Sequence, residues 1–232
     1  EVADNSKLYR ISAPGLILFS LTVTFATFDW IMTLDHHWYS TIFGVYFFAG
    51  STMSFFAFLI LIIRAVQSNG HLKGVVTVEH YHDMGKLMFA FMCFWTFIAF
   101  SQYVLIWYGN IPEETVWYAH RWVGSWKYVS LFLAIGHFVI PFILLMPRGV
   151  KRSKKGLAIF AIWLLFMQFV DMYWLIMPNF HKHDMHVSWI DLAAWVSLGG
   201  FTLHFIVRKL KQHPLVPVKD PFLEESIGFI NH

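Results

Sequence analysis

The chain alternates between long apolar stretches and short polar segments. Six stretches are apolar on every face of a helix, as is typical of helices surrounded by lipid. The third stretch, Leu87 to Tyr108, holds 22 residues without a formal charge, enough at ~1.5 Å per residue to cross a hydrocarbon layer of ~30 Å. Strand-like alternation is absent, and helices are then the only plausible spanning form. The sequence therefore predicts an all-α polytopic membrane protein with one transmembrane domain, whose six spans cover residues 11–34, 41–63, 87–108, 128–146, 156–177 and 189–207.

Helix-breaking residues mark several of the predicted boundaries. Pro14 suits the first turn of the first span, where its missing N–H would have no partner. Gly109 and Asn110 interrupt the long third apolar stretch. Pro147 and Pro178 follow the fourth and fifth spans and end them. The chain begins with Glu and has no signal peptide before its first span, so we expect it to be part of a longer protein.

Composition supports the membrane interpretation and narrows the chemistry. The chain is 57% hydrophobic and only 13% charged, whereas soluble domains carry about 25% charged residues. Its single cysteine, Cys93, lies inside an apolar span. One cysteine cannot form a disulfide within the chain, a cysteine-ligated iron–sulfur cluster or a c-type haem attachment site.

Basic residues orient the six predicted spans. The N-terminal segment, the loops after the second and fourth spans and the C-terminal tail together hold 14 of the 17 Lys and Arg residues. Only Arg121, Lys127 and Lys182 lie in the other loops. The positive-inside rule therefore predicts that both ends of the chain are cytoplasmic. The basic run at 148–155 is expected to contact anionic membrane lipids, and it requires no nucleic-acid partner.

Five polar residues inside the apolar spans are the candidates for chemistry: Asp29, His137, Gln168, Asp171 and His204. A charge at mid-membrane costs ~2.5–3.5 kcal/mol, so such groups usually face the interior of a bundle. Gln168 and Asp171 share one helical face, and His137 is expected roughly 8 Å deeper than Asp171. We predict that Asp171, supported by Gln168, exchanges protons with His137 through water or a quinone headgroup, and onward to Asp29. The alternative is that these groups only fix helix packing, which is the favoured interpretation for His204.

Resident cofactors are not expected. His137 and His204 differ in depth by about 8 Å, which disfavours a haem with two histidine ligands. His181, His183 and His186 in the outer loop lack the i, i+4 spacing of a helical metal site. We therefore expect this chain to bind no metal, haem, iron–sulfur cluster or flavin.

The outer segment Gly109–Trp126 combines charged residues with large aromatic residues, which are enriched at protein interfaces. It is predicted to dock against a neighbouring subunit. The residues that suggest docking are Glu113, Glu114, Trp117, Tyr118, His120, Arg121 and Trp122.

Three segments resemble a known family: FDWIMTLDHHWYSTIFGVYFFAG at 28–50, EHYHDMGKLMFAFMCFWTFIAFSQYVLIWYGNIPEETVWY at 79–118, and HPLVPVKDP at 213–221. They are similar to the ActF-type membrane subunit of bacterial alternative complex III, a quinol:electron-acceptor oxidoreductase. That subunit belongs to the NrfD/PsrC-like family. The resemblance implies a bundle of about ten helices, of which this chain would be the C-terminal six, in the bacterial inner membrane.

The same resemblance implies a set of partners and a role. The partners would be a sister NrfD-like membrane subunit and periplasmic multihaem cytochrome c and iron–sulfur subunits, with a terminal oxidase as a further candidate. The chain would line a quinone cavity or a proton path, and Asp29, His137 and Asp171 are the candidate residues. The alternative is a structural scaffold that holds the periplasmic redox subunits. A secondary transporter is disfavoured because the sequence offers no pair of broken helices.

Overall fold

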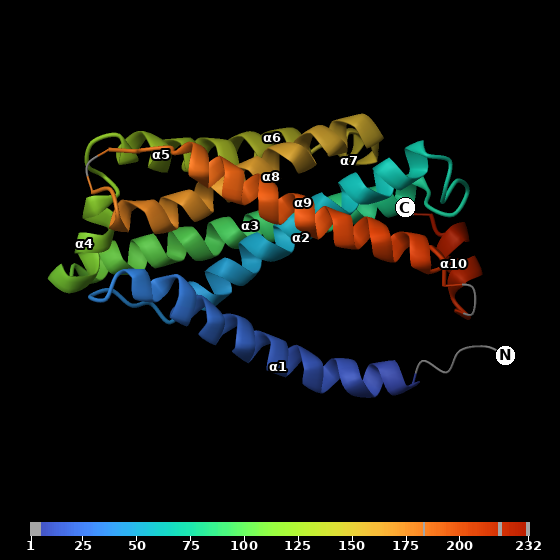
Figure 1. Ribbon diagram of the computed structural model, residues 1–232, viewed down its shortest axis with the longest axis horizontal. Coiled ribbons are helices and arrows are strands. Elements are labelled where there is room, and N and C mark those ends of the chain that lie inside the picture. Colours follow the sequence, from blue (N-terminus) through green and yellow to red (C-terminus); the bar gives the residue numbers. More distant parts are fainter. Residues whose placement is uncertain (1–5, 183, 218–219, 231–232) are drawn as a thin grey trace.

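The computed structural model describes residues 6–182, 184–217 and 220–230. Across these residues, six helices are long and apolar enough to cross a membrane. They extend roughly along the long axis of the molecule (Figure 1). The predicted all-α, multi-pass membrane fold is therefore confirmed.

The fourth membrane-spanning segment differs from the others because its helix is interrupted. It consists of α5 (Trp126–Leu133), a six-residue π-helix (Ala134–Val139) and α6 (Ile140–Leu145). The remaining spans are α1 (Ser6–Trp30), α2 (Phe43–Ser68), α3 (Val78–Gly109), α8 (Lys154–Ile176) and α9 (Trp189–Gln212). Three short helices lie outside the spans: α4 (Pro112–His120), α7 (Arg148–Arg152) and α10 (Leu223–Gly228).

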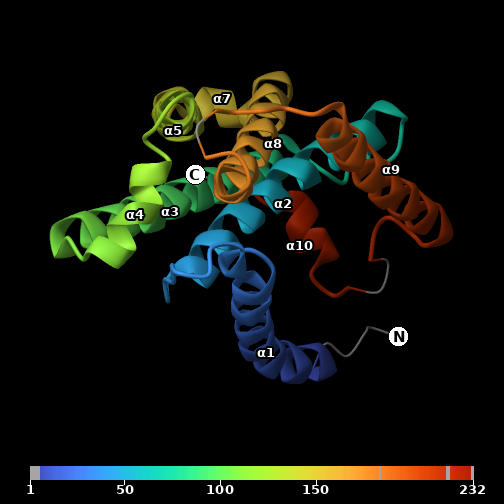
Figure 2. The same ribbon diagram turned by 60° about the vertical axis from the view of Figure 1, so that its left-hand side comes forward.

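The core of the bundle is built around α2, which packs against α3 on one side and α8 on the other. The fourth span closes the group by packing on α8 and α3. In Figures 1 and 2, α1 and α9 diverge from this central group. The side chains of α9 include no buried residue, and α1 contacts mainly α2. The two peripheral helices therefore leave more of their apolar surface uncovered than the central four helices do.

Among the predicted helix starts, those of the first and third spans differ most from the structure. Pro14 does not lie in a first helical turn, because α1 already begins at Ser6. The apolar pattern marks only the lipid-facing part of a helix, and the polar residues before Pro14 continue the same helix. For the same reason α3 begins at Val78 rather than near Leu87, and its first turn is closed by a hydrogen bond from the Thr77 backbone N–H to Nδ1 of His80 at 3.1 Å.

The predicted break after the third span is present, but the segment that follows is not a simple loop. Asn110 takes a left-handed conformation with φ of 48° and ends α3. Pro112 then starts α4, where a missing N–H costs nothing, and Glu113 and Glu114 occupy its first turn. The middle of the predicted docking segment is therefore a helix.

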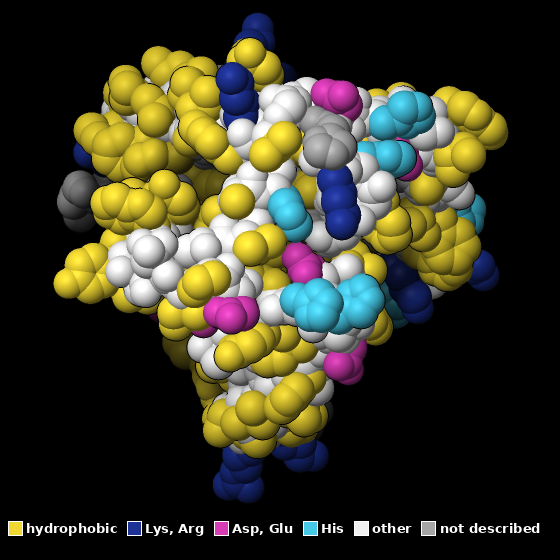
Figure 3. Space-filling model, turned by 90° about the vertical axis from the view of Figure 1, so that its left-hand side faces the viewer, with side chains coloured by type: hydrophobic (Ala, Val, Ile, Leu, Met, Phe, Trp, Pro, Cys, Tyr) yellow, Lys and Arg dark blue, Asp and Glu magenta, His cyan; other side chains and the backbone are white. Residues whose placement is uncertain are grey.

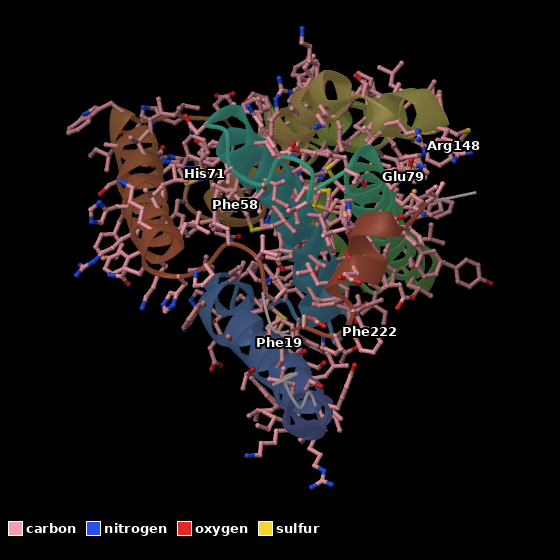
Figure 4. All side chains as sticks on the ribbon, turned by 90° about the vertical axis from the view of Figure 1, so that its right-hand side faces the viewer. Phe19, Phe58, His71, Glu79, Arg148 and Phe222 are labelled. Atoms are coloured by element: carbon pink, nitrogen blue, oxygen red, sulfur yellow. The ribbon has the colours of Figure 1, made fainter. Side chains whose placement is uncertain are left out.

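At one end of the bundle, the short helices α7 and α10 are fastened to the start of α3. At the end that Figure 4 faces, Glu79 on α3 forms a two-pronged ion pair with Arg152 on α7, and Arg148 lies close by. Ser226 of α10 lies 3.1 Å from Nε2 of His80, which fastens the C-terminal segment to the start of α3. The start of α1 and α10 lie at this same end (Figure 1). Because the described chain has six spans, an even number, the start of α1 and the segment after α9 lie at the same end of the bundle.

Candidate functional site

Asp171 is the centre of a buried polar group that joins three helices. It lies on α8 with no exposed surface. Tyr46 on α2 donates its hydroxyl to Oδ1 at 2.5 Å, and Trp95 on α3 donates Nε1–H to Oδ2 at 3.2 Å. Nε2 of Gln168 lies 3.5 Å from the same Oδ2. A buried carboxylate is tolerated only where donors surround it, and this arrangement supplies them.

Gln168 occupies space that a glycine leaves free. A Cβ placed on Gly50 of α2 would lie 2.6 Å from Oε1 of Gln168. Within the described part of the chain, Oε1 of Gln168 and Oγ of Ser54 are buried without a hydrogen-bond partner. Buried polar atoms are seldom left unpaired, so these are positions at which ordered water would complete the group.

His137 joins this group through an aromatic contact. It lies in the π-helix with no exposed surface, and its ring stacks on Trp95 with 3.9 Å between ring centres. Both ring nitrogens are without a hydrogen-bond partner among the described residues. Three of the four predicted relay residues, Asp171, Gln168 and His137, are therefore gathered around one indole ring.

The fourth predicted relay residue stands apart from this group. Asp29 is exposed near the end of α1. His204 is likewise exposed, on α9, and does not pack into the central bundle.

Tyr46 and Trp95 are not among the candidate site residues that the sequence pattern indicates. Each carried a signal in the sequence. Trp95 lies in the middle of an apolar span rather than at a membrane interface, and a buried indole N–H needs an acceptor. Tyr46 begins a stripe on α2 that continues through Gly50 and Ala57, and small residues at such spacing indicate close helix packing.

A cavity of about 610 Å³ opens beside Asp171. It lies between α3 and the fourth span and is walled mostly by apolar and aromatic side chains, as ligand pockets usually are. Phe97 and Phe100 at its rim are each 64% exposed. Because both lie in a membrane-spanning helix, the cavity opens sideways toward lipid. We call it the lateral cavity; its polar lining consists of Tyr46, Thr96, Gln102, Tyr103, Tyr118, Ser130 and Asp171.

A second set of polar side chains, linked by hydrogen bonds, lies at the end of the lateral cavity near α4. Ser40 donates its hydroxyl to Oε1 of Gln102 at 3.3 Å, and Nε2 of Gln102 donates to the Tyr118 hydroxyl at 3.3 Å. Burial raises the pKa of Tyr118, so its hydroxyl stays protonated. Ser130 and Ala134 of the fourth span also line this cavity. An amphipathic molecule would therefore meet hydrogen-bonding groups at two levels.

Arg121 is buried, although it was predicted to contact a neighbouring subunit. It is 1% exposed, and its guanidinium lies 3.5 Å from the centre of the Trp117 ring. It donates to the backbone oxygens of Trp117, Trp174 and Leu175 at 3.0, 3.3 and 2.9 Å. Burial lowers the pKa of Arg121 to about 9, so it remains a cation at neutral pH. Arg121 thus fastens α4 across the C-terminal end of α8.

The surface at the α4 end carries several histidines and acidic residues (Figure 3). The His36 and His37 rings stack on each other there and line a small cavity of about 220 Å³ together with His120. Among the described residues, no three His, Cys, Asp or Glu side chains gather closely enough to hold a metal. His183 of the predicted loop set lies outside the described residues.

No protein-family model matches the chain, and no curated protein sequence matches it. The site must therefore be interpreted from its own geometry and from the quoted resemblance.

Proposed function

We propose that the chain is a membrane subunit of a quinol-oxidising respiratory complex, related to alternative complex III, and that the lateral cavity receives the quinol. The observation that carries this proposal is the position of a buried carboxyl group on the wall of an aromatic cavity that opens to lipid. Quinol is a lipid-soluble molecule with a flat aromatic headgroup and two hydroxyl groups. The cavity offers aromatic faces for the ring. Asp171 has no exposed surface in this structure, and it would accept a quinol hydroxyl once the headgroup displaces the Tyr46 or Trp95 donor.

Oxidation of one quinol to quinone releases two electrons and two protons. In this proposal the electrons leave to haem or iron–sulfur centres of partner subunits, since we expect this chain to contribute no redox centre of its own. Asp171 accepts the two protons one after the other, so that each leaves in its own transfer, and Tyr46 and Trp95 stabilise the carboxylate before each proton arrives. His137, with water at the unpaired atoms around Gln168, carries the proton onward. Asp29, which is exposed near the end of α1, is left as a surface acceptor in this proposal.

A scaffold role is the second candidate, and one observation favours it. The outer faces of α1 and α9 are apolar and uncovered, which suits contact with further membrane subunits. A scaffold needs no titratable group in its core. The two candidates therefore differ in whether Asp171 matters beyond assembly.

Replacing Asp171 with Asn tests the proposal, since it preserves the shape of the side chain and removes its proton acceptor. We expect the complex to assemble and its quinol turnover to fall by about a hundredfold or more, the lower end of the range for loss of a positioned base. Turnover and proton release would be measured on the purified complex in lipid vesicles. Asp184→Asn, in an exposed loop, is the matched control and should behave as wild type. An assembled Asp171→Asn complex with normal turnover and proton release would leave the scaffold as the better explanation.

A further inference from the structure

The π-helix in the fourth span turns His137 away from the lateral cavity. In an uninterrupted α-helix, Ser130, Ala134 and His137 would share one face, because their spacings are four and three residues. Ser130 and Ala134 line the cavity, but His137 does not; Phe138 takes the place on the cavity wall. The π-helical turn at Ala134–Val139, called the wide turn below, holds one residue more than an α-helical turn. The face of the helix after Ala134 is therefore rotated.

The backbone around this turn is held by one side chain. Pro141 has no N–H, so the i to i+5 bond that would reach the Gly136 carbonyl in a π-helix is missing. Nε1–H of Trp163 on α8 donates to that carbonyl at 2.7 Å instead. Gly136 permits the close approach, since a Cβ there would lie 3.0 Å from Cε of Met167. The Trp163 bond therefore stabilises the wide turn at this position.

The observed position leaves His137 poorly satisfied. Its two ring nitrogens are fully buried and have no hydrogen-bond partner among the described residues. A neutral imidazole has one donor and one acceptor, and each buried group left unpaired costs stability. Facing the cavity, the same ring would meet polar side chains, water or a bound ligand. The observed position of the wide turn is favoured by the hydrogen bond from Trp163 to the Gly136 carbonyl. A position that turned His137 into the cavity would instead be favoured by hydrogen bonds to the His137 ring.

We infer that the π-helix is a two-position element that moves His137 between Trp95 and the lateral cavity. If the extra residue of the wide turn shifts along the chain toward α6, the α-helical backbone of α5 extends through His137. The His137 side chain then rotates by about 100° around the helix axis, which is one residue step of an α-helix. In one position the ring stacks on the indole that binds Asp171. In the other it faces the contents of the cavity, beside Ser130 and Ala134. A group that binds His137 in the cavity shifts the population toward the second position.

Trp163→Phe tests this inference, because it keeps an aromatic ring but removes the donor to Gly136. The full chain in its native membranes would be treated with diethyl pyrocarbonate, and the modification rate of the His137 peptide would be measured by mass spectrometry. Exposed His36 provides the internal standard. We expect His137 to be protected in the wild type and to react severalfold faster in Trp163→Phe.

Trp126→Phe is the matched control. It removes a bond of the same kind in the same span, from Nε1 to the His181 carbonyl at 2.7 Å, without touching the π-helix. His137 should stay protected in that variant. Equal reactivity of His137 in both variants, whether fast or slow, would overturn the inference. This measurement follows ring access rather than turnover, so its outcome is independent of the Asp171 experiment on which the proposed function depends.

Discussion

At the scale of single residues, the buried polar group depends on side chains that bridge helices. Trp95 both donates to Asp171 and stacks on His137, while Tyr46 supplies the second donor to the carboxyl group. No two of these residues are neighbours in sequence. A group built in this way keeps its geometry only as long as α2, α3 and α8 stay packed.

Arg121 leads to a prediction about stability. Replacing it with Met keeps much of the apolar stem but leaves three backbone oxygens without their donor. Removing one partner of a buried hydrogen bond typically costs about 1–3 kcal/mol. We expect Arg121→Met to lower the thermal unfolding midpoint by several degrees, measured by intrinsic fluorescence in lipid nanodiscs. Arg10→Met, at an exposed position on α1, should leave the midpoint unchanged. Similar midpoints for both variants would mean that Arg121 does not hold α4 to α8.

The polar residues of the site could be found from sequence because charge in an apolar span is rare and costly. That argument identified Asp171 and His137 but could not show what surrounds them. Tyr46 and Trp95 could not be recognised from sequence because a membrane span contains many aromatic residues. Only the packing of the helices shows that the Tyr46 hydroxyl and the Trp95 Nε1–H point toward Asp171. Arg121 was misjudged for the opposite reason: it lies between spans, where residues are expected to be exposed.

At the scale of helices, span number and type follow from hydropathy, whereas irregularities within a span do not. The π-helix adds one residue to a turn without changing the apolar pattern. The spacing of Ser130, Ala134 and His137 would put all three on one face of an α-helix, whereas only Ser130 and Ala134 line the lateral cavity. The extension of α3 to Val78 was missed for a related reason, since polar helical turns outside the lipid carry no hydropathy signal.

Contact between α1 and α2 provides a prediction at this scale. A Cβ on Gly44 would lie 2.9 Å from Cα of Thr24, which is backbone that cannot move aside. Gly44→Ala should therefore force the two helices apart and destabilise the protein by about 1–3 kcal/mol, the usual cost of overpacking. Unfolding in nanodiscs would measure it. Gly15→Ala on α1 meets nothing within 4 Å and is the control. Equal stability of the two variants would argue against close packing of α1 on α2.

At the scale of the whole molecule, the arrangement of the spans leads to a prediction about orientation. The charge distribution predicts that the loop between α2 and α3 faces the cytoplasm and that the loop between α8 and α9 faces outward. Lys73→Cys and Asp184→Cys place one exposed thiol in each loop. In a Cys93→Ser background, a membrane-impermeant maleimide added to intact cells should label only Asp184→Cys. Labelling of Lys73→Cys alone would reverse the predicted orientation.

The sideways opening of the lateral cavity changes what its occupancy depends on. A ligand that enters from lipid binds from the bilayer, into which it partitions. The concentration that sets its binding is therefore its mole fraction among the lipids rather than its molarity in the buffer. Diluting a vesicle sample with water should leave occupancy unchanged, whereas fusing it with empty lipid should empty the cavity. Half-saturation constants for this protein would then be comparable between preparations only when expressed per lipid.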